Sequence, residues 1–193
     1  DGGDAFASVG SGQSTGTKLF CLSGHVMYPG VYEAKFGITL RQLLDLAGGI
    51  SGTGRLKGVL IGGAAGAFVG QRDLEMPLTF EGARAAGTSL GSAVVMAFDD
   101  TVDLQQILLR IAAFFRDESC GQCVPCRVGT VRQEELLHRL AQKRPIYSRA
   151  TELVVLKEVG QAMRDASICG LGQTASSAIE SAFARFNLFS EKA

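Results

Sequence analysis

The sequence predicts an α+β protein, in which a small sheet-containing unit over residues 18–99 is followed by an all-α four-helix bundle over residues 100–193. In the first part, short apolar stretches alternate with Gly-rich turns, which is typical of a small sheet. After Asp99 and Asp100, apolar residues recur every three or four positions, as on one face of a helix. Five cysteines, three of them within seven residues, indicate metal or redox chemistry in the helical part.

The composition is that of a folded protein without a dominant charge. Of the 193 residues, 46% are hydrophobic and 20% are charged, and 19 basic side chains balance 19 acidic ones. This balance gives no electrostatic reason to expect a nucleic acid as partner, and no apolar run approaches the roughly 20 residues of a bilayer span. The clustered cysteines favour a reducing compartment. We therefore expect a cytoplasmic protein without a membrane span, at most peripheral to a membrane.

The first 99 residues are expected to contain a linker and then the small α+β unit. Residues 1–17 are rich in Gly, Ser and Thr and predict a loop or linker, and because the first residue is Asp1, we expect the chain to begin inside a longer polypeptide. Thr39 is a candidate N-cap for a short helix over residues 40–47. Cys21 lies in an apolar strand and is interpreted as a buried core thiol. The expected strands cover residues 19–26, 31–36, 59–61, 67–69 and 94–98.

Residues 100–193 have the pattern of four amphipathic helices joined by short connections. Thr130 and Gln133 have the spacing of a capping box, so we expect the second helix to begin near Thr130. In an up-down bundle, the connection between the first two helices and the connection between the last two lie at the same end. The helices are expected to run from Leu104 to Phe115, from Thr130 to Lys143, from Ser148 to Met163 and from Thr174 to Phe189.

The cysteines fall in those two connections, with Cys120, Cys123 and Cys126 in the first and Cys169 in the second. Three thiolates in a C-x2-C-x2-C loop can bind three irons of one cubane, and a distant thiolate then binds the fourth iron. Gly121 permits the tight backbone that such a loop requires. The spacing therefore predicts that these four cysteines are the metal ligands of one [4Fe–4S] cluster.

Four thiolates also suit structural zinc, and a zinc-stabilised interaction module without a redox role is the alternative function. Zinc sites usually combine two C-x2-C pairs, whereas three clustered cysteines and a distant fourth are typical of a cubane. The glycines of residues 61–66 lack the strand–loop–helix context of a nucleotide site, and we interpret them as turns.

Two regions of the chain resemble a known family. The first resemblance is to the flavoprotein subunit of NADH dehydrogenases. This subunit occurs in respiratory complex I, in NAD-dependent formate dehydrogenases and in soluble hydrogenases. The resemblance lies in residues 118–130, ESCGQCVPCRVGT, and 167–174, SICGLGQT. The family's soluble-ligand-binding β-grasp (SLBB) domain is similar to residues 23–33, SGHVMYPGVYE, and 37–44, GITLRQLL. The resemblance covers nearly the whole chain and implies that residues 18–99 form a β-grasp domain.

The resemblance implies a role in an oxidoreductase. In this family, the cysteines that match Cys120, Cys123, Cys126 and Cys169 bind a [4Fe–4S] cluster that receives electrons from FMN. The implied partners are other iron–sulfur subunits of a multisubunit oxidoreductase, namely a 2Fe–2S thioredoxin-like subunit and a catalytic subunit. The family's N-terminal FMN and NAD(H) domain is absent from these residues. We therefore expect both cofactors in the parent subunit only, and no catalysis by this segment alone.

Overall fold

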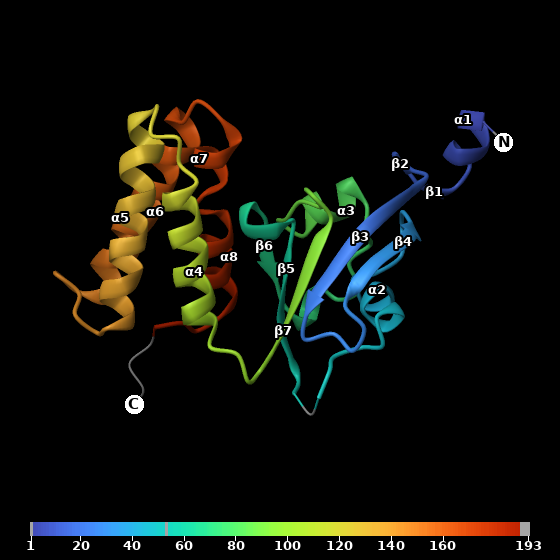
Figure 1. Cartoon of the computed structure of the whole chain (residues 1–193), viewed down its shortest axis with the longest axis horizontal. Coiled ribbons are helices and arrows are strands. Elements are labelled where there is room, and N and C mark those ends of the chain that lie inside the picture. Colours follow the sequence, from blue (N-terminus) through green and yellow to red (C-terminus); the bar gives the residue numbers. More distant parts are fainter. Residues whose placement is uncertain (1, 53, 190–193) are drawn as a thin grey trace. The chain divides into compact units, whose positions relative to one another are not determined.

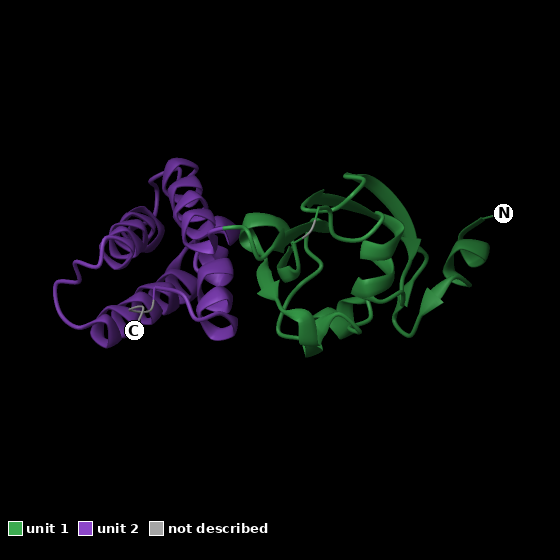
Figure 2. Ribbon diagram, turned by 90° about the horizontal axis from the view of Figure 1, so that it is seen from below, with its two compact units in different colours: residues 1–102 green, residues 103–193 purple. Residues whose placement is uncertain are grey.

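The chain folds into two compact units, residues Asp1–Val102 and Asp103–Ala193 (Figure 2). The computed structural model describes residues 2–52 and 54–189. The first unit contains a sheet with short helices, and the described part of the second unit contains helices (Figure 1), so the predicted α+β class is confirmed. None of the described helices has the length and apolar character that crossing a membrane requires.

A five-stranded sheet is the centre of the first unit (Figure 1). Its strands are β3 (Thr17–Gly24), β4 (Gly30–Lys35), β5 (Leu56–Ile61), β6 (Ala67–Val69) and β7 (Val94–Asp99). The strand order is β4-β3-β7-β5-β6, in which β3 and β7 are parallel and the other neighbours are antiparallel. All five predicted strands are therefore present, with bounds that differ by a few residues.

The helix α2 (Leu40–Leu46) adds its apolar face to the core of this unit. Its predicted N-cap is confirmed, because Thr39 Oγ1 accepts a hydrogen bond from the Gln42 N–H at 3.2 Å, and Gln42 Oε1 accepts one from the Thr39 N–H at 2.9 Å. Large side chains that are completely or almost completely buried in this core are Phe20, Leu40, Leu43, Ile61, Leu78 and Leu90.

Cys21 is exposed, which corrects the prediction of a buried core thiol. Successive side chains of a strand point to opposite faces of the sheet. On β3, Phe20 and Leu22 are buried, whereas Cys21 and Leu19 are exposed, Leu19 to 60%. The apolar composition of the strand was therefore misleading, because it is the period of two that places Cys21 on the outer face.

The first unit also contains elements that the sequence did not predict, some of them in the expected linker. These are α1 (Gly2–Ala7), β1 (Gly10–Ser11), β2 (Ser14–Thr15), α3 (Phe80–Ala85) and the short 3₁₀ helices η1 (Gly63–Ala65) and η2 (Gln71–Asp73). Ser14 Oγ donates to Glu81 Oε2 at 2.7 Å and accepts from the Phe80 N–H at 3.0 Å, which ties the linker to α3. Such contacts between distant segments leave no local sequence pattern.

The second unit contains three long helices and two shorter ones among its described residues. They are α4 (Leu104–Asp117), α5 (Val124–Ala141), α6 (Arg149–Ala166), α7 (Gly170–Thr174) and α8 (Ser177–Arg185). The helix α4 packs against α5 and α8, and α5 packs against α6 and α7. Two predictions are corrected: the second helix begins at Val124 instead of near Thr130, and the fourth helix is shorter than the predicted range and is preceded by the separate short helix α7.

The early start of α5 places Cys126 on a helix and not in a loop. Thr130 is not a cap: it is buried, and its Oγ1 donates to the backbone oxygen of Cys126 at 2.9 Å, one turn earlier in the same helix. The overlooked signal is Pro125, which lies in the first turn of α5. Proline is favourable there because its fixed φ suits the helix and no hydrogen bond needs its missing N–H.

A buried carboxylate links α5 to α6. Glu152 is 2% exposed, and it accepts hydrogen bonds from Arg139 at 2.8 and 3.2 Å and from the Ile146 N–H at 2.9 Å. The Arg139 guanidinium holds the pKa of Glu152 below its ordinary value, with a smaller contribution from the Ile146 N–H, although burial opposes this shift.

The substitution Glu152→Gln is expected to lower the free energy of unfolding by about 2 kcal/mol, because Arg139 loses its charged partner. Since the folded-state pKa of Glu152 is lowered, the stabilisation is fully present above the pKa of the unfolded chain. It is then lost as the pH falls through the folded-state pKa. Urea unfolding of both proteins from about pH 7 to about pH 3 should therefore show a difference that shrinks in acid.

The matched control for this prediction is Glu135→Gln. Glu135 pairs with Arg132 at 2.7 Å, and the two side chains are 43% and 64% exposed. Exposed pairs contribute roughly 0–1 kcal/mol, so this variant should unfold almost like the unchanged chain. An equal effect of the two substitutions, or an effect of Glu152→Gln that does not depend on pH, would contradict the role given to the buried pair.

Candidate metal centre

All four predicted ligands line one pocket of about 230 Å³ in the second unit. Cys126 is buried, Cys123 is half-buried, and Cys120 and Cys169 are exposed. The complete lining consists of Glu118, Ser119, Cys120, Gln122, Cys123, Cys126, Ile168, Cys169 and Leu171. The two segments that the sequence predicted to meet are therefore brought together by the fold.

The start of α5 positions the cysteine triplet. Cys123 is the N-cap of α5 and Cys126 lies in its first turn, so both thiols lie beside N–H groups that have no partner inside the helix. Cys120 lies in the preceding loop, where Gly121 has a φ of 75°, which residues with a Cβ rarely adopt. Arg127 Nη1 donates to the backbone oxygen of Gly121 at 2.7 Å and thereby holds this loop against α5.

Local hydrogen bonds and burial give two of the thiols opposite pKa shifts. The backbone N–H groups of Ile168 and Cys126 lower the pKa of Cys123, the Ser167 hydroxyl adds to this effect, and burial opposes it. Burial raises the pKa of Cys126, although the Ser119 hydroxyl opposes the shift, and the thiols of the other three pocket cysteines raise it further. Cys126 is therefore electrostatically coupled to the other three pocket cysteines.

Close packing of α7 against α5 brings the fourth cysteine to the triplet. Cys169 is the N-cap of α7, and Gly172 is buried in the same helix. A Cβ on Gly172 would lie 2.8 Å from the Cβ of Cys126 and would overlap the hydroxyl of Ser167. Only a glycine at this position therefore allows α7 to lie so close to the start of α5.

Two glutamines fix the segment that carries the fourth cysteine. Gln133 Nε2 donates to the backbone oxygen of Ala175 at 3.1 Å, and Gln173 Nε2 donates to that of Ser167 at 3.0 Å. Sequence reasoning placed Gln133 in a capping box, which is wrong because its side chain bonds to Ala175, and it missed Gln173 and Gly172. The only local signal is the pair of glycines within residues 170–172, because a glycine inside a helix often marks a close approach.

The pocket suits a metal cluster better than a single metal ion. In a zinc site, four sulfur atoms close around the ion at about 2.3 Å and leave no space between them. Here the thiols are distributed over the wall of a pocket of about 230 Å³. Thiols with N–H and hydroxyl groups beside them are the donor set of an iron–sulfur cluster.

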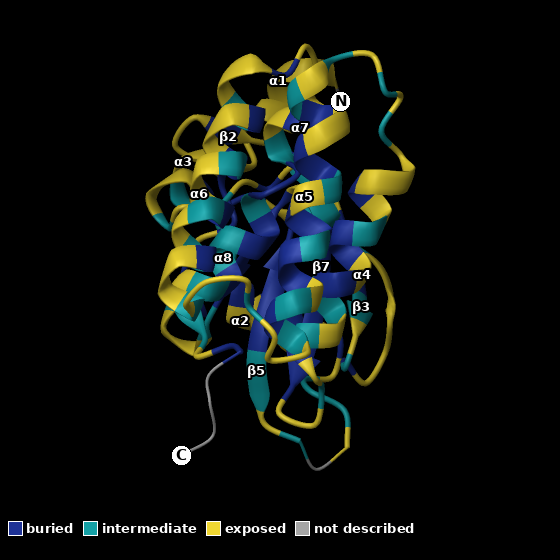
Figure 3. Ribbon diagram, turned by 90° about the vertical axis from the view of Figure 1, so that its left-hand side faces the viewer, coloured by how far each residue is buried: buried dark blue, intermediate teal, exposed yellow. Residues whose placement is uncertain are grey.

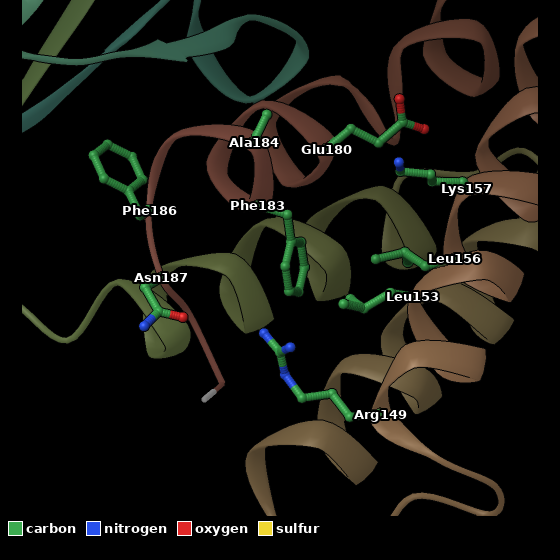
Figure 4. A pocket seen from close by; sticks show the side chains of 9 residues that line it. All are labelled: Arg149, Leu153, Leu156, Lys157, Glu180, Phe183, Ala184, Phe186 and Asn187. Atoms are coloured by element: carbon green, nitrogen blue, oxygen red, sulfur yellow. The ribbon is translucent and has the colours of Figure 1, made fainter. Parts of the chain in front are cut away.

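A larger pocket of about 400 Å³ lies between α6 and α8 (Figure 4). The Phe183 ring projects into it toward Leu153 and Arg149. Arg149 donates to the backbone oxygens of Leu188 and Phe189 at 2.8 and 2.9 Å, which anchors the segment after α8. The residues that line this pocket include no cysteine or histidine. The smaller pocket is therefore the candidate metal centre, because the thiols are there.

Burial differs between the two sides of the long helices of this unit (Figure 3). Each long helix has a buried side and an exposed side, and Cys126 belongs to the buried side of α5. The thiol pocket therefore has an inner wall made by the core of the unit and an outer side that carries the exposed Cys120 and Cys169.

Two family models match the chain. The NADH-ubiquinone oxidoreductase-F iron-sulfur binding region matches residues 106–192, which include all four pocket cysteines. The SLBB domain matches residues 18–107. The resemblance found in the two sets of sequence segments is thereby confirmed.

Relatives from several organisms align over nearly the whole chain. The F subunit of the NADH-quinone oxidoreductase of Mycobacterium bovis is 39% identical over 183 residues, which are 95% of this chain and 40% of that protein. Its counterpart in Streptomyces coelicolor is 40% identical over 185 residues, with coverages of 96% and 40%. The HndC subunit of the NADP-reducing hydrogenase of Solidesulfovibrio fructosivorans is 32% identical over 175 residues, with coverages of 90% and 35%. The chain thus spans about two fifths of the length of these relatives.

A solved structure agrees in sequence and fold. The crystal structure of an NAD⁺-reducing [NiFe]-hydrogenase in the H₂-reduced state matches with a TM-score of 0.83 and 33% identity, over 96% of this chain and 31% of that chain. Residues 18–107 therefore belong to the SLBB domain family, and residues 106–192 belong to the iron–sulfur binding region of the NADH-ubiquinone oxidoreductase-F family.

Proposed function

We propose that this chain is an electron-transfer segment of an NAD(H)-dependent oxidoreductase, in which Cys120, Cys123, Cys126 and Cys169 bind one [4Fe–4S] cluster. The main support is the single pocket that these four thiols line, although they come from two distant segments. The match to an iron–sulfur binding region also supports this role. So do the relatives, which are components of an NADH-quinone oxidoreductase and an NADP-reducing hydrogenase.

The residues of the pocket have different tasks in this proposal. When bound, the cluster supplies one-electron oxidation and reduction. Cys126 is buried and keeps water from the inner side of the pocket, while the free N–H groups at the start of α5 stabilise the negative thiolates. The exposed Cys120 and Cys169 lie at its accessible side, where a redox partner can approach.

In the parent protein, electrons pass between FMN and iron–sulfur centres of partner subunits, namely a 2Fe–2S thioredoxin-like subunit and a catalytic subunit. FMN and NAD(H) bind outside these residues, in the part that accounts for the greater length of the relatives. Residues 18–99 act as a β-grasp domain that packs within the assembly, and residues 100–193 act as a four-helix bundle around the cluster. The parent enzyme is an NADH dehydrogenase, a formate dehydrogenase or a hydrogenase in the cytoplasm, without nucleic acid as partner.

The test of this function is the response of the anaerobically purified chain to two reductants. The chain should contain about four irons and four sulfides, and dithionite should bleach its brown colour. NADH should not bleach it, with or without added FMN, because the described residues offer no helix N-terminus after a Gly-rich phosphate loop. A longer protein that includes the FMN-binding part should be bleached by NADH. Stoichiometric zinc without iron would instead support a zinc-stabilised interaction module, and bleaching of this chain by NADH would place a nucleotide site within it.

A further inference from the structure

Ser119 lies in hydrogen-bond contact with one of the cluster ligands. Its Oγ is 3.3 Å from Cys126 Sγ, and it accepts a hydrogen bond from the Gly121 N–H at 3.4 Å. Between a hydroxyl and a free thiol, either group can donate. A metal-bound thiolate has no proton, and the hydroxyl oxygen already accepts from the backbone. In the loaded site, the Ser119 hydroxyl therefore donates to the sulfur of Cys126.

Ser167 has a buried hydroxyl that needs an acceptor. The residue is 6% exposed, and its Oγ makes no hydrogen bond within residues 2–52 and 54–189. Leaving a buried hydroxyl without a hydrogen-bond partner is unfavourable. A Cβ built on Gly172 would overlap the Ser167 Oγ and would lie 2.8 Å from the Cys126 Cβ, so the hydroxyl lies beside the first turn of α5. The chain neighbour of Ser167, Ile168, lines the thiol pocket.

We propose that Ser119 and Ser167 are positioning residues whose hydroxyls donate hydrogen bonds to sulfurs of the cluster site, Ser119 to that of Cys126, and thereby raise the reduction potential of the cluster. This inference rests on the proposed function, because it requires the cluster to be bound at these cysteines. It gives the Ser167 hydroxyl, which has no hydrogen-bond partner among the described residues, a sulfur acceptor in the loaded protein.

The sign of the effect follows from the charge change. One-electron reduction adds a negative charge that is shared by the irons and all their sulfur ligands. A hydroxyl dipole with its hydrogen toward sulfur stabilises the more negative, reduced state more strongly than the oxidised state. Removing the two hydroxyls therefore lowers the reduction potential of the cluster. The reduction itself neither adds a proton to the site nor removes one.

The experiment is a redox titration of the loaded chain, monitored by electron paramagnetic resonance with dithionite as reductant. Compared with the unchanged chain, Ser119→Ala combined with Ser167→Ala is expected to shift the reduction equilibrium about tenfold, which lowers the midpoint potential by about 60 mV. Each single substitution should give part of this shift, and Ser119→Thr should restore the value because it keeps the hydroxyl. Ser176→Ala is the control: Ser176 is also buried in the same unit, but its hydroxyl accepts a hydrogen bond from Arg164 and does not contact a sulfur of the described residues.

The outcomes separate this inference from the proposed function. An unchanged chain without iron contradicts the function itself, whereas a loaded double variant with the original potential overturns only the role of the serines. An equal shift in Ser176→Ala would also overturn it, because a general loss of packing would then explain the change. If Ser119→Ala, Ser167→Ala and Ser119→Thr all lose the cluster, the serines are needed to hold the cluster, and the tuning role is wrong.

Discussion

Replacing Cys169 by serine is expected to reduce the iron content from about four atoms per chain to well below one. The three thiols of the α5 segment remain, but the fourth iron loses its protein ligand from the other side of the pocket. Because metal binding and folding are coupled, the free energy of unfolding of the helical unit should fall together with the iron content. Iron and sulfide analysis measures the first effect, and anaerobic urea unfolding measures the second.

Cys21→Ser is the matched control for this prediction. Cys21 is also exposed, but it lies on the outer face of β3 in the first unit, whereas the four other cysteines line a pocket of the second unit. The variant should therefore keep its full iron content and its electron paramagnetic resonance spectrum. Loss of iron in Cys21→Ser, or full iron content in Cys169→Ser, would show that the ligand assignment is wrong.

The sequence was sufficient to predict features that depend on local spacing. Thr39 caps α2 as expected, and Gln42, which was not predicted to take part, completes a capping box within the same turn. The apolar period from Leu104 to Phe115 is long enough to define α4. The meeting of the four thiols was also predictable, because helices with short connections return the chain to the same end of the unit.

Features that depend on tertiary contacts were not predictable in the same way. The hydroxyl of Thr130 could have capped a helix or bonded back to the preceding turn, and the same spacing fits both possibilities. The exposure of Cys21 depends on which face of β3 the core covers. Ser167 and Gly172 are important only because α7 lies against α5, and that contact joins segments far apart in the sequence.

The contact between α7 and α5 can be tested by a second substitution. Gly172→Ala is expected to displace α7 and remove most of the cluster. The added Cβ would lie 2.8 Å from the Cβ of Cys126 and would overlap the Ser167 hydroxyl, so α7 must move away from α5. Overpacking of this kind costs about 1–3 kcal/mol. The displacement also changes the position of Cys169 relative to the triplet, and a cubane tolerates little change because its four ligand positions are fixed. Iron content and urea unfolding of the loaded chain measure the two consequences.

Gly170→Ala is a control within the same helix. A Cβ on Gly170 would have no neighbour within 4 Å, so the substitution adds a methyl group that points into open space. Alanine is favoured over glycine in helices by about 1 kcal/mol, so this variant should keep its iron and unfold at an equal or slightly higher urea concentration. If both variants keep their iron, the close approach of α7 to α5 is not required for the cluster. If both lose it, the backbone of α7 needs glycine for a reason other than packing against Cys126. Only loss of iron in Gly172→Ala together with its retention in Gly170→Ala agrees with a cluster site whose fourth ligand is positioned by this one contact.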